Sequence, residues 1–235
     1  MFKIAYGAGH NNFTANGIPK ELWAEAENEW VLNDRVARYF AQAAKLYDVE
    51  LLRVDDPFGL APVDLKERCK AANDWGADFF LSIHHNAGIN GGSGGGIVAY
   101  SYYNSVKGAQ WRDAFYDALI QHTGLKGNRS APKQTAGYYV IKNTTAPAVL
   151  LELGFMDSTT DVPVILTEEY ATQCAEAIVE VLAVRGGLTR KNNTADWAAS
   201  AWQKATAKGI LDGTRPADAV TRQELAAVLD RLGLL

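Results

Sequence analysis

Apolar, strand-like runs alternate with amphipathic, helix-like segments from residue 1 to about residue 184, and this alternation is the strongest constraint on the fold. The first helix-like segment carries Leu32, Val36 and Tyr39 at helical spacing. Such alternation predicts an α/β fold, with a mostly parallel twisted sheet and helices on both faces. We predict strands over residues 2–6, 49–54, 79–83, 97–102, 138–141 and 148–152, and helices from near residue 27 and over 62–75, 105–123 and 168–184.

The composition changes after the last of these helices. A polar, glycine-bearing stretch over residues 186–193 predicts a linker between a domain at 1–185 and a small all-helical module at 194–235. Within the module, helices are predicted over 196–208 and 221–232. Two helices of this size cannot bury a substantial core alone, so we expect the module to dock on a partner or on the first domain.

Composition excludes several classes of protein. With 48% apolar residues and a net charge of −4, the chain can form a core and has no basic surplus for nucleic acid binding. No apolar stretch reaches the ~20 residues of a membrane span, so no membrane insertion is expected. No signal peptide is recognisable, which predicts synthesis in the cytoplasm. Cys69 and Cys174 are read as buried free thiols rather than a disulfide.

Two histidines follow predicted strands. His10 comes after the first strand through Gly7-Ala8-Gly9, and His84 comes directly after the run that ends at Ile83. Because catalytic groups gather at the carboxyl ends of parallel strands, these imidazoles are placed to share a metal, and Glu152 ends a third strand at the same edge. A third metal ligand is expected from the acidic residues near the first helix, and spacing alone does not choose among them: Glu21, Glu25, Glu27 and Glu29.

A glycine-rich run over residues 91–96 precedes a predicted strand rather than a helix. It lacks the lysine and hydroxyl residue of a nucleotide-phosphate loop, so we interpret it as a flexible loop on the substrate side.

The chain resembles the zinc-dependent N-acetylmuramoyl-L-alanine amidases of the type 3 family, which occur in bacterial autolysins and phage endolysins. The resemblance covers about residues 1–184 in the family's order. It rests on Gly9-His10, Glu29-Trp30-Val31-Leu32-Asn33, Leu65-Lys66-Glu67-Arg68 with Ala71-Ala72-Asn73, Ser82-Ile83-His84-His85-Asn86-Ala87, and Pro147-Ala148-Val149-Leu150-Leu151-Glu152-Leu153-Gly154-Phe155. It implies Zn²⁺ held by His10, Glu29 and His84, with Glu152 as the catalytic carboxylate. Glu29 is chosen because the family's glutamate precedes an asparagine by four positions, as Glu29 precedes Asn33.

The chain departs from the family pattern at two places. Gly7-Ala8-Gly9-His10-Asn11 stands where the family usually has Asp-Pro-Gly-His-Gly, and His85 stands where a small residue is usual. Neighbours on a strand point to opposite faces, so His84 and His85 cannot both reach one metal. His84 is taken as the ligand, and His85 and Asn86 are expected to bind substrate or support the ligands. His122 is read as a surface or packing residue.

The resemblance implies hydrolysis of the amide between N-acetylmuramic acid and L-alanine of the peptidoglycan stem peptide. Two other functions stay open: a zinc peptidase cutting within the stem peptide, and a catalytically silent wall-binding protein. The leading interpretation is a phage endolysin or related lytic amidase with a wall-targeting tail, and for an endolysin we expect release to the wall by a holin-like partner.

The C-terminal residues resemble one S-layer homology motif. The matching pieces are Trp197, Trp202, Gly209-Ile210-Leu211-Asp212-Gly213, Pro216 and Val220-Thr221-Arg222-Gln223-Glu224-Leu225. This resemblance implies binding to a wall polymer. Because relatives commonly carry three copies and this chain has one, we expect a possible homo-oligomer through residues 194–235. The competing interpretation is a helical hairpin that closes the catalytic domain.

Overall fold

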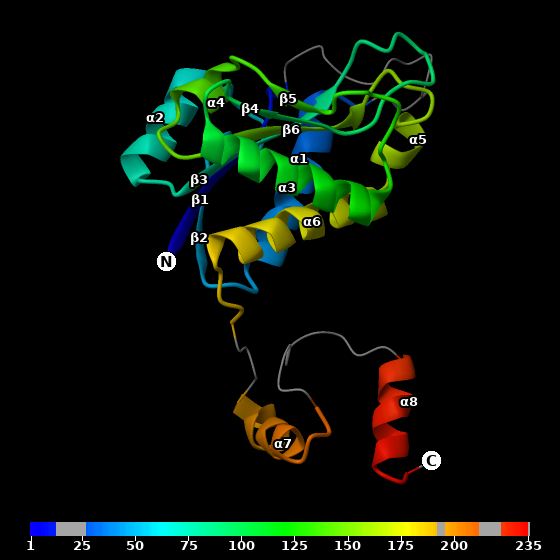
Figure 1. The fold of residues 1–235 in the computed structure, drawn as a ribbon. Coiled ribbons are helices and arrows are strands. Elements are labelled where there is room, and N and C mark those ends of the chain that lie inside the picture. Colours follow the sequence, from blue (N-terminus) through cyan, green and yellow to red (C-terminus); the bar gives the residue numbers. More distant parts are fainter. Residues whose placement is uncertain (13–26, 192–195, 212–221, 235) are drawn as a thin grey trace. The chain divides into compact units, whose positions relative to one another are not determined.

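The computed structural model describes residues 1–12, 27–191, 196–211 and 222–234 (Figure 1). The chain separates into two compact units, Met1–Thr189 and Arg190–Leu235.

The first unit is built on a six-stranded sheet with the strand order β2-β1-β3-β6-β4-β5. Four of the five strand pairs are parallel, and only β4 runs antiparallel to its neighbour β6. The prediction of an α/β fold with a mostly parallel sheet is therefore confirmed for the described residues. The strands are β1 (Phe2–Ala8), β2 (Val49–Arg53), β3 (Phe79–Asn86), β4 (Val98–Ser101), β5 (Lys133–Thr135) and β6 (Ala148–Phe155).

Helices cover both faces of this sheet. The larger core lies under α1 (Glu29–Ala44), α3 (Val106–Thr123) and α6 (Glu168–Gly186), which pack on alternate strand residues such as Leu81 and Leu151. The smaller core lies under α2 (Leu65–Trp75) and α4 (Tyr139–Asn143), on the intervening residues such as Phe80 and Leu150. Figure 1 shows α3 and α6 on one side of the sheet and α2 and α4 on the other. A short helix, α5 (Val162–Ile165), follows β6.

One predicted strand is wrong. Residues 138–141 were expected to be extended because they are aromatic and β-branched, but they begin the helix α4. Val140 and Ile141 are buried against Cys69 and Ala72 of α2, and packing of this kind overrides strand propensity. The sheet's edge strand is instead β5, whose three polar residues give no periodic signal.

The strand β3 also continues further than the sequence indicates. It was expected to end at Ile83, but it runs through His84 and His85 to Asn86, paired with β6. The register shifts between His84 and Asn86, where Leu153 and Gly154 of β6 lie opposite His85 alone. Gly154 has φ 107° and an added Cβ would meet Ile165 at 2.7 Å, so this bulge requires glycine.

The glycine-rich loop is tied down rather than free. The Asp157 carboxylate accepts hydrogen bonds from the backbone amides of Gly88, Ile89 and Asn90 at 2.7–2.8 Å. Further along, Asp161 accepts from the Gly96 amide at 2.7 Å, and both carboxylates are at least nine-tenths buried. The segment that follows β6 therefore fixes the loop that follows β3, against the expectation of a flexible loop.

The first unit contains two thiols, and two helices are described in the second unit. Cys69 and Cys174 are free and buried, as predicted. The second unit contains α7 (Asp196–Ala207) and α8 (Arg222–Arg231). None of the described helices is both long enough and apolar enough to span a bilayer.

We predict that Asp157→Ala releases the loop at residues 88–90. Three partly buried amides would lose a charged acceptor, which should lower the free energy of unfolding by about 2–4 kcal/mol. Hydrogen exchange should accelerate at Gly88, Ile89 and Asn90 and stay slow at Val149 in the sheet centre. Glu176→Ala, an exposed acid-to-alanine change on α6, is the matched control. Unchanged exchange at 88–90 in folded Asp157→Ala would contradict this account.

Candidate metal and catalytic centre

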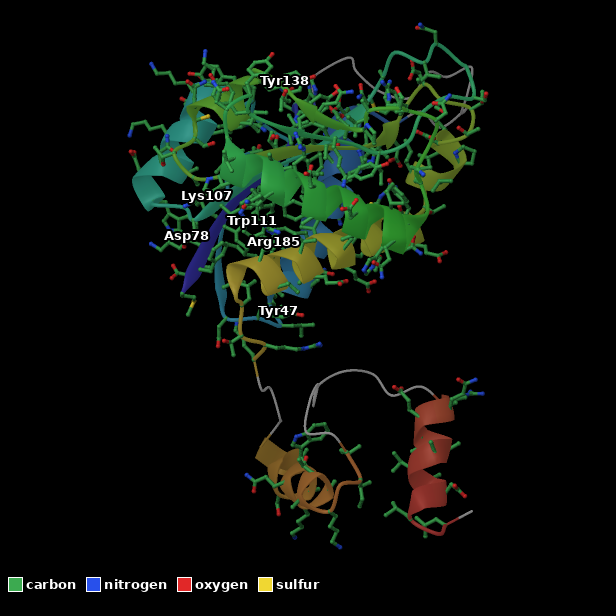
Figure 2. All side chains as sticks on the ribbon, in the orientation of Figure 1. Tyr47, Asp78, Lys107, Trp111, Tyr138 and Arg185 are labelled. Carbon is green, nitrogen blue, oxygen red and sulfur yellow. The ribbon has the colours of Figure 1, made fainter. Side chains whose placement is uncertain are left out.

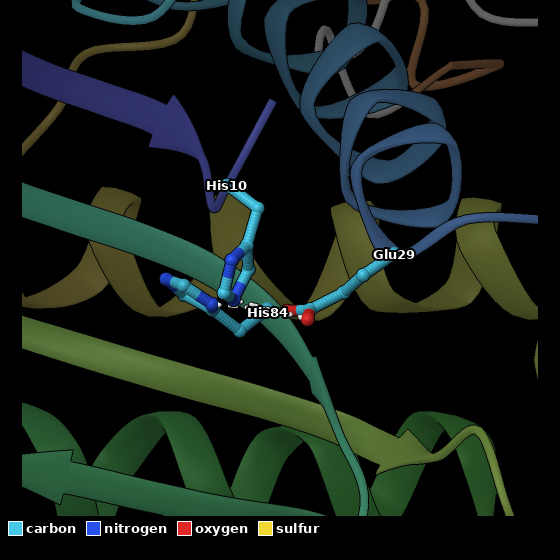
Figure 3. A group of neighbouring side chains, drawn as sticks. All are labelled: His10, Glu29 and His84. Atoms are coloured by element: carbon cyan, nitrogen blue, oxygen red, sulfur yellow. Dashed lines mark hydrogen bonds and ion pairs between the residues drawn. The ribbon is translucent and has the colours of Figure 1, made fainter. Parts of the chain in front are cut away.

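Three side chains from separate elements converge at the carboxyl edge of the sheet. His10 follows β1, Glu29 opens α1 and His84 lies in β3, and one ligand atom from each lies within 4.8 Å of the others (Figure 3). The Glu29 carboxylate lies between the two rings: Oε2 is 3.0 Å from His10 Nε2, and Oε1 is 3.0 Å from His84 Nδ1. The structure thus brings together the three residues that the resemblance implied as metal ligands.

Glu29 is held as a buried anion. Asn28 caps α1 by accepting the Val31 amide at 3.0 Å, which places Glu29 in the first turn. The residue is only 3% exposed. Burial alone would raise the pKa of Glu29, but its hydrogen bonds with His10 and His84 outweigh burial and hold that pKa below its usual range. A buried carboxylate of this kind needs a partner for its charge.

His10 is aimed by a strained turn. It has φ 61°, in the left-handed region that few non-glycine residues adopt. Arg68 of α2, itself buried, donates to the carbonyl oxygens of Ala8 at 2.6 Å and His10 at 2.7 Å. At Gly9, a Cβ would lie 2.1 Å from the His84 ring, so only glycine fits between the two histidines. Arg68 lies in one of the motifs that carry the family resemblance, but no local pattern predicts its role. Its contacts are to backbone atoms 58 and 60 residues away.

His84 and His85 point to opposite faces of the sheet, as strand geometry requires. His84 lies on the face of α2 and α4, where its Nε2 is 3.1 Å from Ser82 Oγ. His85 faces α1, is 2% exposed and places Nδ1 2.8 Å from Asn33 Oδ1. Burial lowers the pKa of both rings, that of His85 to about 3, so both are neutral.

His85 lies behind the cluster rather than on a substrate surface. Asn33, its partner, also donates to Glu29 Oε1 and to the Gly9 carbonyl oxygen, both at 3.3 Å. Direct substrate contact by His85, expected from the sequence, does not fit this burial, whereas support of the ligands does. The other residue expected to bind substrate, Asn86, is partly exposed, and its Oδ1 accepts the Ala87 amide at 2.8 Å.

Glu152 lies beside the cluster on the same face as His84. The two residues are register partners in the parallel pair of β3 and β6. Its Oε2 atom is buried and has no hydrogen-bond partner among the described residues. Burial and the negative charge of Glu29 raise the pKa of Glu152 well above its ordinary value. A carboxyl group with a raised pKa beside a candidate metal site is suited to accept and return a proton.

The remaining acidic candidates and His122 have other partners or are not described. Glu27 forms an ion pair with Arg35 at 2.8 Å. Glu21 and Glu25 lie outside the described residues. His122 pairs with Glu180 at 2.8 Å on the far side of the sheet, consistent with a surface role.

The donor set fits a catalytic zinc ion. Two imidazole nitrogens and one carboxylate are ligands that zinc takes, and catalytic zinc normally has three protein ligands. Burial lowers the pKa of His84 and the hydrogen bonds with both rings hold the pKa of Glu29 down, so this imidazole is neutral and the carboxylate is charged, as metal binding requires. Asn33, Ser82 and Arg68 supply the hydrogen bonds that orient the three ligands.

Comparison with known proteins identifies the family. The family model described as N-acetylmuramoyl-L-alanine amidase (Amidase_3) matches residues 4–184, so the chain belongs to this family. The chain is 32% identical over 166 residues to the N-acetylmuramoyl-L-alanine amidase CwlM of Bacillus licheniformis, which covers 68% of this chain and 59% of that protein. It is 33% identical over 114 residues to the sporulation-specific N-acetylmuramoyl-L-alanine amidase of Bacillus subtilis, which covers 48% of this chain and 42% of that protein.

Solved structures share the fold. The catalytic domain of CwlV from Bacillus (Paenibacillus) polymyxa var. colistinus superposes with a TM-score of 0.70 at 22% identity, covering 80% of this chain and 100% of that one. An N-acetylmuramoyl-L-alanine amidase from Clostridium difficile 630 gives a TM-score of 0.68 at 22% identity, covering 79% of this chain and 97% of that one. The chain spans about three fifths or less of the length of the curated relatives above.

We predict that Arg68→Met weakens metal binding without preventing folding. Losing the two carbonyl contacts should let the turn at His10 relax, and outer-sphere changes of this kind cost ~10–100-fold in metal affinity. Co²⁺ titration against a competing chelator measures this affinity. Lys66→Met, an exposed change on the same helix, is the control. Wild-type affinity in a folded Arg68→Met protein would remove Arg68 from the support of the site.

Proposed function

We propose that this member of the amidase family is a zinc-dependent peptidoglycan hydrolase that cleaves the amide between N-acetylmuramic acid and L-alanine. The observation that carries the proposal is the His10–Glu29–His84 cluster, beside which the buried Glu152 Oε2 has no hydrogen-bond partner among the described residues. Family membership supplies the substrate class, because the three ligands alone specify only metal-assisted hydrolysis.

His10, Glu29 and His84 would hold the zinc ion. When bound at such a site, zinc supplies Lewis acidity, which polarises the scissile carbonyl group and acidifies a water molecule. Glu152 takes the proton of the attacking water and returns it to the nitrogen of the leaving L-alanine. Its unpartnered Oε2 atom makes it available for this transfer. Glu152 and His84 lie side by side at the last regular register position before the bulge at Gly154.

We further propose that the second unit targets the wall. Its support is the S-layer homology resemblance together with exposed leucines on α8 and after it, Leu225 at 51% and Leu232 at 46%. Self-association through this unit would add avidity without new contacts. Assignment as an endolysin, and passage to the wall through a holin-like partner, stay predictions from the sequence.

Analysis of the ends released from purified peptidoglycan tests the proposed reaction. We expect new L-alanine amino groups in step with free lactyl carboxyl groups on muramic acid, and chelation followed by zinc addition should abolish and restore the release. New ends within the stem peptide would identify a peptidase instead. No release by zinc-loaded protein that still binds walls would identify a silent binding protein.

We predict that Glu152→Gln retains the metal and the fold but loses hydrolysis by about 10²–10⁴-fold, because the water loses its proton acceptor. Metal content and thermal unfolding should match the wild type, which separates this effect from ligand loss. Glu168→Gln, at an exposed position on α6, is the control. Near wild-type turnover in metal-replete Glu152→Gln would exclude Glu152 as the acid and base.

Truncation after Thr189 should separate catalysis from targeting. We expect turnover of soluble muropeptides to persist, since the centre lies within Met1–Thr189, and activity on whole walls to fall. Co-sedimentation with walls and the mass in solution, measured before and after truncation, check targeting and self-association. Unchanged wall binding and mass would contradict both, and insolubility of the truncated chain would favour a docked hairpin.

A further inference from the structure

A cluster of tyrosines extends from the proposed catalytic centre along β4 and the start of α4. Its members are Tyr100, Tyr102, Tyr103 and Tyr138. Tyr100 and Tyr138 make an edge-to-face pair with ring centroids 5.1 Å apart, and Tyr102 and Tyr103 are 5.7 Å apart. The two pairs are neighbours, because Gly137 precedes Tyr138 and lies against the Tyr103 ring. A Cβ added at Gly137 would be 3.2 Å from that ring.

This tyrosine cluster is continuous with Glu152. Val98 is the antiparallel register partner of Glu152, so Tyr100, two residues further along β4, lies diagonally beside Glu152 on the same face. Burial, Tyr138 and the Glu152 charge together raise the pKa of Tyr100 to about 12, so this hydroxyl is neutral. Figure 2 shows Tyr138 on the side of the sheet opposite α3 and α6. Strand alternation places the side chains of His84 and Glu152 on that same face.

The outer members of the tyrosine cluster are open to solvent. Tyr103 is 61% exposed and Tyr138 is 44% exposed, while Tyr100 and Tyr102 are half-buried against the smaller core. Burying such rings is favourable, and partly exposed tyrosines grouped on one rigid surface are typical of a recognition site. Each residue offers an apolar ring face and a neutral hydroxyl that both donates and accepts.

We infer that the tyrosine cluster is the subsite for the glycan strand, with a pyranose ring stacked on Tyr138 and Tyr103. The inference rests on the proposed function and adds the part of the substrate that this surface binds. An uncharged sugar presents C–H faces to aromatic rings and hydroxyl groups to tyrosine hydroxyls. The stem peptide carries carboxylates, for which arginine or lysine is the matched partner, and the four members of the cluster are all neutral tyrosines.

Binding of peptide-free glycan strands to the full-length protein tests this inference without catalysis. Isothermal titration should show Tyr138→Ala and Tyr103→Ala weakening glycan binding by roughly 3- to 10-fold each, with stem-peptide binding unchanged. Tyr139→Ala is the matched control, since Tyr139 is 41% exposed but forms no ring pair with the cluster among the described residues. The truncated chain ending at Thr189 repeats the titration, so that glycan held by the second unit is subtracted.

The outcomes are distinct from those of the reaction itself. In hydrolysis assays the tyrosine variants should raise KM for glycan-linked substrate and leave kcat within about twofold. Equal glycan binding by Tyr138→Ala, Tyr103→Ala and wild type would overturn the subsite. Variants that lose stem-peptide binding and keep glycan binding would overturn it as well. A wild-type protein that binds glycan through these residues but releases no L-alanine ends would refute the proposed reaction and leave the subsite standing.

Discussion

The Glu29 carboxylate is the interaction on which the centre depends. It is a buried charge, and its two oxygens are held by rings from β1's end and from β3, so α1, β1 and β3 meet at one point. Removing either ring would take one hydrogen-bond partner from a charge in the protein interior. The two histidines that hydrogen-bond the Glu29 carboxylate also form, with it, a set of three ligand atoms for a cation. The contacts that stabilise this edge of the sheet are therefore the same ones that build the proposed metal site.

Support for the three ligands comes from groups that act mostly on backbone and buried atoms. Arg68 fixes the turn at His10 from the α2 side, and Asn33 with His85 fixes Glu29 from the α1 side. Glycine at position 9 is required because His84 occupies the space that any side chain would need. The centre is therefore built between two helix layers, with the sheet edge as its floor and with a buried Glu152 Oε2 that has no hydrogen-bond partner among the described residues.

Sequence reasoning reached the alternating elements and the residues of the cluster, and it failed where long-range contacts decide. The apolar run before Glu152 and the helical spacing after Glu29 are local signals, and both elements occur as predicted. Residues 138–141 have strand propensity but form a helix because α2 covers them. The burial of His85 depends on α1, and the fixed glycine loop depends on Asp157, which lies over 60 residues later. No local pattern carries such information.

The most direct test of the central claim is anomalous diffraction at the zinc edge from crystals of the zinc-soaked protein. The account predicts one strong peak per chain, bounded by His10, Glu29 and His84, with Glu152 adjacent but not in contact with it. A peak at His85, a peak that excludes Glu29, or no peak at this edge of the sheet from zinc-saturated crystals would contradict it.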